Sequence, residues 1–376
     1  MKKSLTFFSF FIFIVISNNS FAQKKSKSID ENYLIGTYTD NASQGINVIK
    51  FDAKSKQIKL LSTVLGVENP SFVITNNSKT IVVAVEEIAS ENGGKVTSFY
   101  YNKKAKTFIK INSFNTKGNH PCTVAFSPKE DFVLVGNYSG GNLSVFPIDA
   151  KGKLSEMSNF IQYEGKSANV ERQEKPHVHC IAFHPKENII AVADLGTDAI
   201  ELIPFDENSK TFLQNEKALS TKVAAGSGPR HLVWNKAGTI LYVTFELTNE
   251  VGVFQHKDGK LTQIQTLALT NPTKSGSAAE LRLSNDGQFL YASVRGNDNQ
   301  IVVMKTDNLG KFNVIQTIKT ASMPRNFILT KNQKNILVAT QGSNLISVFD
   351  RNEKTGLLTA TSNEITINKP VYLFPF

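Results

Sequence analysis

Cys122-Thr-Val-Ala-Phe-Ser-Pro128 and His179-Cys-Ile-Ala-Phe-His-Pro185 are two copies of one pattern, a short apolar strand that ends in a turn. The pattern returns in Arg230-His-Leu-Val-Trp-Asn-Lys236 and Ala279-Glu-Leu-Arg-Leu-Ser-Asn285, and a second apolar run follows each copy. Several short strands in each unit, without helical periodicity, are typical of a β-propeller blade of four strands. Seven strand starts align in this way, 46 to 57 residues apart: Pro70, Pro121, Val178, Pro229, Ala278, Pro324 and Pro370.

The two ends of the chain complement each other. The seventh start, Lys369-Pro-Val-Tyr-Leu-Phe-Pro-Phe376, supplies a first strand with nothing after it. Near the N-terminus, Tyr33-Leu-Ile-Gly-Thr-Tyr38 matches the second strand of the other units, and Gly45-Ile-Asn-Val-Ile-Lys-Phe51 matches the third. We therefore predict an all-β, seven-bladed propeller over residues 33–376. The N- and C-terminal strands would share one four-stranded blade, which leaves no long unpaired edge.

Residues 1–22 have the pattern of a secretory signal peptide. Lys2 and Lys3 precede an almost wholly apolar run at 7–16, and Ser20-Phe21-Ala22 places small residues at the expected cleavage positions. A membrane anchor is the alternative, but the run is shorter than the roughly 20 apolar residues of a spanning helix. We expect cleavage, a flexible lead-in at 23–32, a periplasmic or secreted location, and no membrane attachment of the mature chain.

The formal net charge of +10 favours small anionic ligands through long-range attraction. The lysines are scattered over predicted loops without interleaved aromatic residues, a pattern of solvated charge, so we predict no nucleic-acid partner. Cys122 and Cys180 lie near the starts of neighbouring inner strands in different registers, so we expect free thiols rather than a disulfide. A ring closed within one chain favours a monomer.

The repeat places a set of polar residues at one end of the ring. In a propeller the second strand of each blade runs antiparallel to the first, so its end lies beside the start of the first strand. Side chains of both charges from separate blades predict a site for a small anionic or oxygen-rich ligand, although each alone could form an inter-blade ion pair. The residues around the first-strand starts are His120, His177, His179, Arg230 and Arg325. Those 17 residues after an aligned start are Glu87, Tyr138, Glu246 and Arg295.

Several chemistries lack their motifs in this sequence. It contains no Gly-x-Ser-x-Gly elbow, no Walker-type phosphate loop, no Gly-x-Gly-x-x-Gly opening a helix and no Cys-x-x-Cys-His haem motif. His177-x-His179 has a spacing that could place two imidazoles on one metal, but no third ligand has comparable support. We therefore predict neither a metal nor a cofactor.

The sequence resembles the seven-bladed lactonase family, which includes the propeller-type 6-phosphogluconolactonases and the fungal carboxy-muconate lactonizing enzymes. The resemblance implies a site formed by His177, Arg230, Glu246 and Arg295. Family members commonly carry Asn before the Glu and before the Arg, where this chain has Phe and Val. The stretches that carry the resemblance are Pro176-His-Val-His-Cys180, Asp194-Leu-Gly-Thr-Asp198, Gly228-Pro-Arg-His-Leu232, Tyr242-Val-Thr-Phe-Glu-Leu247 and Leu290-Tyr-Ala-Ser-Val-Arg-Gly296.

The resemblance implies a lactonase that hydrolyses a sugar lactone, as a 6-phosphogluconolactonase does, without a cofactor. Glu246, or His177 if an ion pair engages Glu246, would activate water, and the arginines Arg230 and Arg295 would stabilise the oxyanion. The resemblance favours 6-phosphogluconolactonase activity. The signal peptide keeps open an exported lactonase for an unphosphorylated lactone, and a muconate-type cycloisomerase or a non-catalytic ligand-binding propeller also stays open. The residues expected to bind substrate are His179, Arg325, Tyr138, Glu87 and His120.

Overall fold

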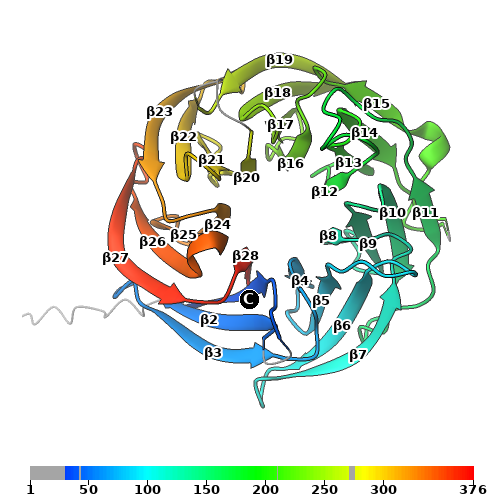
Figure 1. Cartoon of the computed structure of the whole chain (residues 1–376), viewed down its shortest axis with the longest axis horizontal. Helices are drawn as coiled ribbons and strands as arrows, with labels where there is room; N and C mark the ends of the chain where they lie inside the picture. The colour runs from blue at the N-terminus through cyan, green and yellow to red at the C-terminus, as the bar shows by residue number, and fades with distance from the viewer. Residues whose placement is uncertain (1–29, 42–43, 210, 271–275) are drawn as a thin grey trace, which may run out of the picture.

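A computed structural model describes residues 30–41, 44–209, 211–270 and 276–376. They form seven four-stranded antiparallel sheets, arranged as blades in a ring (Figure 1). Runs rich in Val, Ile and Phe form the strands because β-branched and aromatic side chains pack well on a pleated surface. The predicted fold class, the seven blades and the four strands in each blade are confirmed.

The strands run outward from the centre of the ring in chain order in six of the blades. Two short 3-10 helices, η1 (Asn215–Lys217) and η2 (Gln341–Ser343), lie between strands. From the innermost to the outermost strand, the blades are β4 (Val73–Thr75), β5 (Ile81–Glu86), β6 (Lys95–Asn102) and β7 (Thr107–Asn115); β8 (Pro121–Phe126), β9 (Phe132–Asn137), β10 (Asn142–Pro147) and β11 (Asn159–Gln162); β12 (Val178–Phe183), β13 (Ile189–Asp194), β14 (Ala199–Pro204) and β15 (Leu219–Lys222); β16 (Pro229–Trp234), β17 (Ile240–Phe245), β18 (Glu250–Lys257) and β19 (Lys260–Ala268); β20 (Ala278–Leu283), β21 (Phe289–Val294), β22 (Gln300–Thr306) and β23 (Phe312–Lys319); β24 (Pro324–Leu329), β25 (Asn335–Thr340), β26 (Leu345–Arg351) and β27 (Leu358–Thr366); and β28 (Pro370–Pro375), β1 (Asp30–Thr37), β2 (Ile46–Asp52) and β3 (Ile58–Val64).

The last of these blades closes the ring. Its innermost strand, β28, comes from the C-terminus and pairs antiparallel with β1, with Leu34 opposite Phe374 and Ile35 opposite Leu373. The ring of Tyr372 on β28 stacks on that of Phe72 at the neighbouring blade, with 3.7 Å between the centroids. The predicted sharing of one blade by the two termini is confirmed.

The apolar core lies between the faces of neighbouring blades. In one cluster, Leu134 and Leu143 of one blade pack with Ile190 and Val192 of the next, and all four are fully buried. Burial of each such side chain stabilises the fold by about 1.5–3 kcal/mol relative to exposure. Each blade is therefore held in place mainly by its two neighbours.

Two backbone features recur at the end of the ring where the inner strands begin and the second strands end, which we call the mouth. The inner strands β8, β12, β16, β20 and β24 each have a register shift near their first residues. The second feature is a residue with a positive φ, in the left-handed region, before the inner strand. Bulges and left-handed residues break the strict alternation of side chains along a strand, and they decide which side chains reach the mouth. A positive φ precedes the inner strand at Asn69, His120, Gly228, Met323 and Lys369.

The predicted signal peptide at 1–22 lies outside the described residues. So does most of the predicted lead-in, while β1 begins at Asp30, three residues before the propeller start expected from the sequence. In the ranges that the structure describes, no helix has the length and apolar character needed to cross a membrane. Cys122 and Cys180 are both free thiols, as expected.

Candidate functional site

A cavity of about 370 Å³ opens at the mouth. This volume falls in the range of roughly 300–1,000 Å³ that is common for small-molecule sites. Its walls come from the starts of inner strands, the residues that follow second strands, and one connection between blades. Seven of the nine site residues expected from the sequence are among the lining residues, which are Glu87, Cys122, Tyr138, Arg172, His179, Arg230, Glu246, Arg295 and Arg325.

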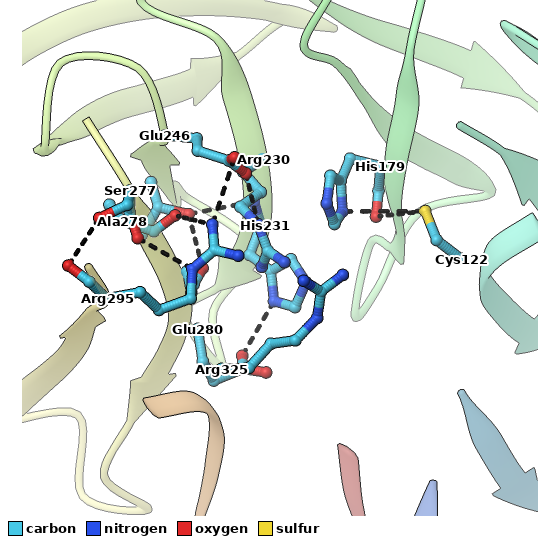
Figure 2. Close-up of polar contacts among 12 residues, drawn as sticks. Cys122, His179, Arg230, His231, Glu246, Ser277, Ala278, Glu280, Arg295 and Arg325 are labelled. Carbon is cyan, nitrogen blue, oxygen red and sulfur yellow. Dashed lines mark hydrogen bonds and ion pairs between the residues drawn. The ribbon is translucent and has the colours of Figure 1, made fainter. Parts of the chain in front are cut away.

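Glu246, which directly follows β17, is the centre of the charge network. Its Oε2 accepts a hydrogen bond from Nε of Arg230 at 2.7 Å. Its Oε1 accepts one from Nη2 of Arg172 at 2.8 Å and lies 3.2 Å from Nη2 of Arg295. Burial opposes ionisation of this carboxyl, but the neighbouring positive charges, led by Arg295 and Arg230, hold its pKa well below the usual range. Figure 2 shows Glu246 grouped with Arg230 and Arg295.

Arg295 is fixed by backbone as well as by charge. Its Nε donates to the carbonyl of Ser277 at 3.0 Å, across the mouth end of the same blade. Burial, opposed by Glu246, lowers the pKa of Arg295 to about 9, so the guanidinium stays protonated at neutral pH.

A second acidic group faces the cavity from another blade. Oε1 of Glu87, which directly follows β5, accepts a hydrogen bond from the hydroxyl of Tyr38 at 2.8 Å. Nη2 of Arg325 donates to the same hydroxyl at 3.1 Å. Glu87 and Arg325 are therefore linked through Tyr38, which directly follows β1, the second strand of the closing blade.

His179 lies opposite the arginine group, beside Cys122 (Figure 2). The Cys122 thiol is positioned to donate to the carbonyl of Val178 at 3.5 Å, and its sulfur lies 3.9 Å from Nδ1 of His179. If Nδ1 carries the proton and donates to the sulfur, Nε2 keeps its lone pair. Burial, followed by the charge of Arg230, lowers the pKa of His179 well below its usual value, so the ring is neutral at pH 7.

His177 and His120 are not among the cavity-lining residues. The His177 ring stacks on Tyr138, and its nitrogens contact the Tyr138 carbonyl at 2.9 Å and Glu174 at 3.2 Å. His120 has φ 52° and its Nδ1 contacts the Ser139 hydroxyl at 2.8 Å. The bulges at the starts of β8 and β12 separate these residues from Cys122 and His179, which do line the cavity.

Arg172 lines the cavity and was not expected from the sequence. It lies in the connection 163–177, the longest one between two blades, and its Nη2 reaches both Glu246 and the Tyr138 hydroxyl, the latter at 3.2 Å. Residues in a connection have no place in the strand repeat, so register could not find it. The sequence did contain one signal of a long connection here: the aligned strand starts Pro121 and Val178 are 57 residues apart, the largest separation in the series.

A second buried polar group lies under the cavity. Glu280 on β20 contacts Nδ1 of His231 at 3.1 Å and Nε of Arg282 at 3.4 Å, and it accepts a hydrogen bond from Asn326. Burial opposes its ionisation, but Arg282 and His231 outweigh burial and lower the pKa of Glu280 to about 2. This pairing of charges joins three inner strands below the mouth.

One group of side chains, at the opposite end of β12 from the mouth, has ligand atoms close enough for a metal ion. His184, Glu187 and His256 place one ligand atom each within 4.8 Å of one another. However, Nδ1 of His184 accepts the backbone N–H of Glu187 at 2.8 Å, and Nε2 donates to the carbonyl of Gly238 at 2.9 Å. Both nitrogens of His184 are thus engaged in holding a turn. His177 and His179 belong to no such group in the described part of the chain.

The cavity combines an excess of positive charge with unused hydrogen-bonding groups. Four arginines and two glutamates line it. Arg230 is only 2% exposed, yet its Nη1 has no partner among the described residues, and the same holds for Oε2 of Glu87. Buried polar atoms are normally satisfied, so these atoms indicate where a polar or anionic ligand, or water, would bind.

The comparisons with known proteins agree with this architecture. The family described as "Lactonase, 7-bladed beta-propeller" matches residues 32–375. A 6-phosphogluconolactonase of Formosa agariphila is 30% identical over 89% of this chain and 96% of its own. A Bacteroides fragilis crystal structure, described as a candidate 6-phosphogluconolactonase, superposes with a TM-score of 0.87 and 34% identity, covering 94% of this chain and 99% of that one. The periplasmic gluconolactonase of Pseudomonas aeruginosa superposes with a TM-score of 0.85 and 29% identity, covering 92% and 98% of the two chains.

The closed ring of seven blades and the arginine-rich cavity at its mouth define a seven-bladed β-propeller with a candidate small-molecule site. The chain belongs to the seven-bladed β-propeller lactonase family, which confirms the resemblance stated from its motifs.

Proposed function

We propose that this protein hydrolyses a sugar lactone to the corresponding aldonic acid in the cavity at the mouth. The observation that carries the proposal is Arg230, a buried cation in the cavity wall with an N–H donor that has no partner among the described residues. The relatives named 6-phosphogluconolactonase and gluconolactonase support the same chemistry. In the reaction, water adds to the lactone carbonyl, the ring C–O bond breaks, and the ring oxygen takes up a proton.

Arg230 and Arg295 would stabilise the oxyanion. Both are held from one side by Glu246, and both are buried, so their positions are fixed before the substrate arrives. Donors preorganised around the developing charge are worth far more in a site that excludes water than in solution. We assign Glu246 the role of positioning this arginine pair.

We propose His179 as the base that activates water, in place of Glu246 or His177. Both carboxylate oxygens of Glu246 are engaged by arginines, and the ring nitrogens of His177 already contact Tyr138 and Glu174. His179 lines the cavity, and its neutral ring can accept a proton. The imidazolium formed in the first step can return that proton to the departing ring oxygen.

We propose that the mature chain is an exported monomer. The signal-like pattern at 1–22 and the periplasmic location in the name of the Pseudomonas aeruginosa relative support export. A ring completed by strands of a single chain supports the monomer. N-terminal sequencing of the protein from a periplasmic extract, together with its sedimentation velocity, tests both parts.

The activity is tested by pH-stat measurement of acid release from glucono-δ-lactone and from 6-phosphogluconolactone, with spontaneous hydrolysis subtracted. We expect His179→Gln and Glu246→Gln to lower kcat by about 100-fold or more. The control Glu171→Gln removes a negative charge from an exposed residue of the connection 163–177 and should keep the wild-type rate. Background rates with both lactones would reject sugar-lactone hydrolysis and leave the cycloisomerase and binding alternatives.

A further inference from the structure

Arg172 differs from the other arginines in the way it reaches the cavity. Arg230 and Arg295 have side-chain exposures of 3% and 7%, whereas the side chain of Arg172 is 40% exposed. It comes from the connection 163–177 rather than from a strand and crosses to both Tyr138 and Glu246. Arg172 is therefore more exposed to solvent than the two strand arginines that also hold Glu246.

The contact of Arg172 with Glu246 can be exchanged without leaving a buried charge unpaired. If Arg172 moves away, Oε2 of Glu246 stays bonded to Arg230 at 2.7 Å and Oε1 stays 3.2 Å from Arg295. Ion pairs of partly exposed side chains contribute little to stability, and salt screens them. Glu246 thus has one arginine more than it needs, while the cavity as a whole has two more arginines than glutamates.

The backbone at Arg172 is fixed, so only its side chain has to move. The Oδ1 atom of Asn169 accepts the backbone N–H of Arg172 at 3.1 Å. The next residue, Gln173, is fully buried and donates its side-chain amide to the carbonyl of Leu195 at 2.8 Å. An anchored backbone with a long, partly exposed guanidinium is suited to bidentate binding of an oxyanion.

We propose that Arg172 is the specificity-determining residue for a phosphate group on the lactone: it leaves Glu246 on binding and holds the phosphate at the solvent end of the cavity. This inference rests on the proposed function, in which the lactone carbonyl lies at the buried end beside Arg230 and His179. It follows that discrimination between a phosphorylated and an unphosphorylated sugar lactone depends on Arg172.

The test uses the reaction products, which do not hydrolyse. Isothermal titration calorimetry on the full mature chain compares 6-phosphogluconate with gluconate for the wild type, Arg172→Gln, Arg172→Lys and Lys166→Gln. Lys166 is an exposed residue of the same connection, so its variant is a control for the loss of one positive charge. We expect Arg172→Gln to weaken 6-phosphogluconate binding by about tenfold or more, because charge-assisted hydrogen bonds to phosphate are strong. Gluconate binding should change less than about threefold, and Arg172→Lys should recover part of the loss.

Equal losses for both acids, or no loss for either, would overturn the assignment of Arg172. These outcomes are separable from failure of the proposed function. A wild type that binds 6-phosphogluconate without hydrolysing either lactone would refute the lactonase while the variants still decide the role of Arg172. A wild type that binds neither acid would overturn the phosphate site, while acid release alone decides whether the lactones are hydrolysed. Circular dichroism and thermal unfolding of each variant show whether a loss reflects misfolding.

Discussion

His179 is expected to control the acid limb of the pH profile. Burial and Arg230 keep its pKa well below the ordinary histidine value of about 6.5, and a base must be unprotonated to act. We therefore expect kcat to stay near its maximum as the pH falls from 7 to 6 and to decline only in more acidic solution. Initial rates of acid release between pH 4.5 and 7.5 measure this. A midpoint at or above 6.5 would rule out His179 as the base.

Glu246 links the site to the stability of the fold. Replacement by Gln leaves Arg230 and Arg295 buried without their counter-charge, and breaking a buried ion pair typically costs about 3–5 kcal/mol of unfolding free energy. The folded-state pKa of Glu246 is lower than its unfolded value, so its contribution is complete above the unfolded pKa. The contribution of Glu246 to the free energy of unfolding is lost as the pH falls through its pKa in the folded state. Urea unfolding should show a large wild-type advantage over Glu246→Gln at pH 7 that shrinks only in strong acid. The surface variant Glu171→Gln should show no such difference.

At the scale of elements, regular pairing made much of the site predictable. A second strand must end beside the start of its antiparallel neighbour, so one spacing in the sequence found Glu87, Tyr138, Glu246 and Arg295 together. The side chains around the starts of the inner strands were harder to place, because their prediction assumed that successive side chains alternate strictly between the two faces of the strand. The left-handed residue His120 and the bulge after Val178 break this alternation, and His120 and His177 consequently lie outside the cavity lining. Bulges depend on tertiary packing that alternation in one strand does not reveal.

The connection 163–177, which carries Arg172, is expected to depend on Gly196. A Cβ atom at Gly196 would lie 1.8 Å from the carbonyl oxygen of Lys175, an impossible contact with backbone. Gly196→Ala should therefore displace the connection and raise the KM for the lactone several-fold. Gly259→Ala is a suitable control, because a Cβ atom there meets nothing within 4 Å and the substitution adds only local φ strain. An unchanged KM in Gly196→Ala would show that the connection does not contribute to substrate binding.

The charge of the whole molecule should affect the encounter with substrate. The chain has a formal net charge of +10, and the cavity adds a local excess of arginine. Salt screens such attraction over about 8 Å at 0.15 M ionic strength. We expect kcat/KM for 6-phosphogluconolactone to decrease as the NaCl concentration is raised from about 20 mM to about 500 mM. The kcat/KM for neutral glucono-δ-lactone should change little over the same range. The same salt dependence for both lactones would exclude electrostatic steering.

Closure of the ring should dominate global stability. Leu373 on β28 is fully buried, and its replacement by Ala should cost about 2–5 kcal/mol through lost contacts and a residual cavity. Deletion of residues 369–376 should abolish a single cooperative transition, because β1 loses its inner partner. Leu61→Ala, at a 51% exposed residue of β3, should stay within about 0.5 kcal/mol of the wild type. Thermal and urea unfolding measure all three variants. A truncated chain that unfolds like the wild type would show that closure is dispensable.

The place of β28 also sets the order in which the fold can be completed during synthesis. The ribosome makes β1 long before β28, so the blade begun at Asp30 waits for its innermost strand until Pro370–Pro375 have been made. Six blades can assemble on the nascent polypeptide, but the circle stays open, with an unpaired edge on β1. The ring can therefore close only after β28 has been made. A prematurely terminated product keeps an exposed edge that proteases and other strands can reach.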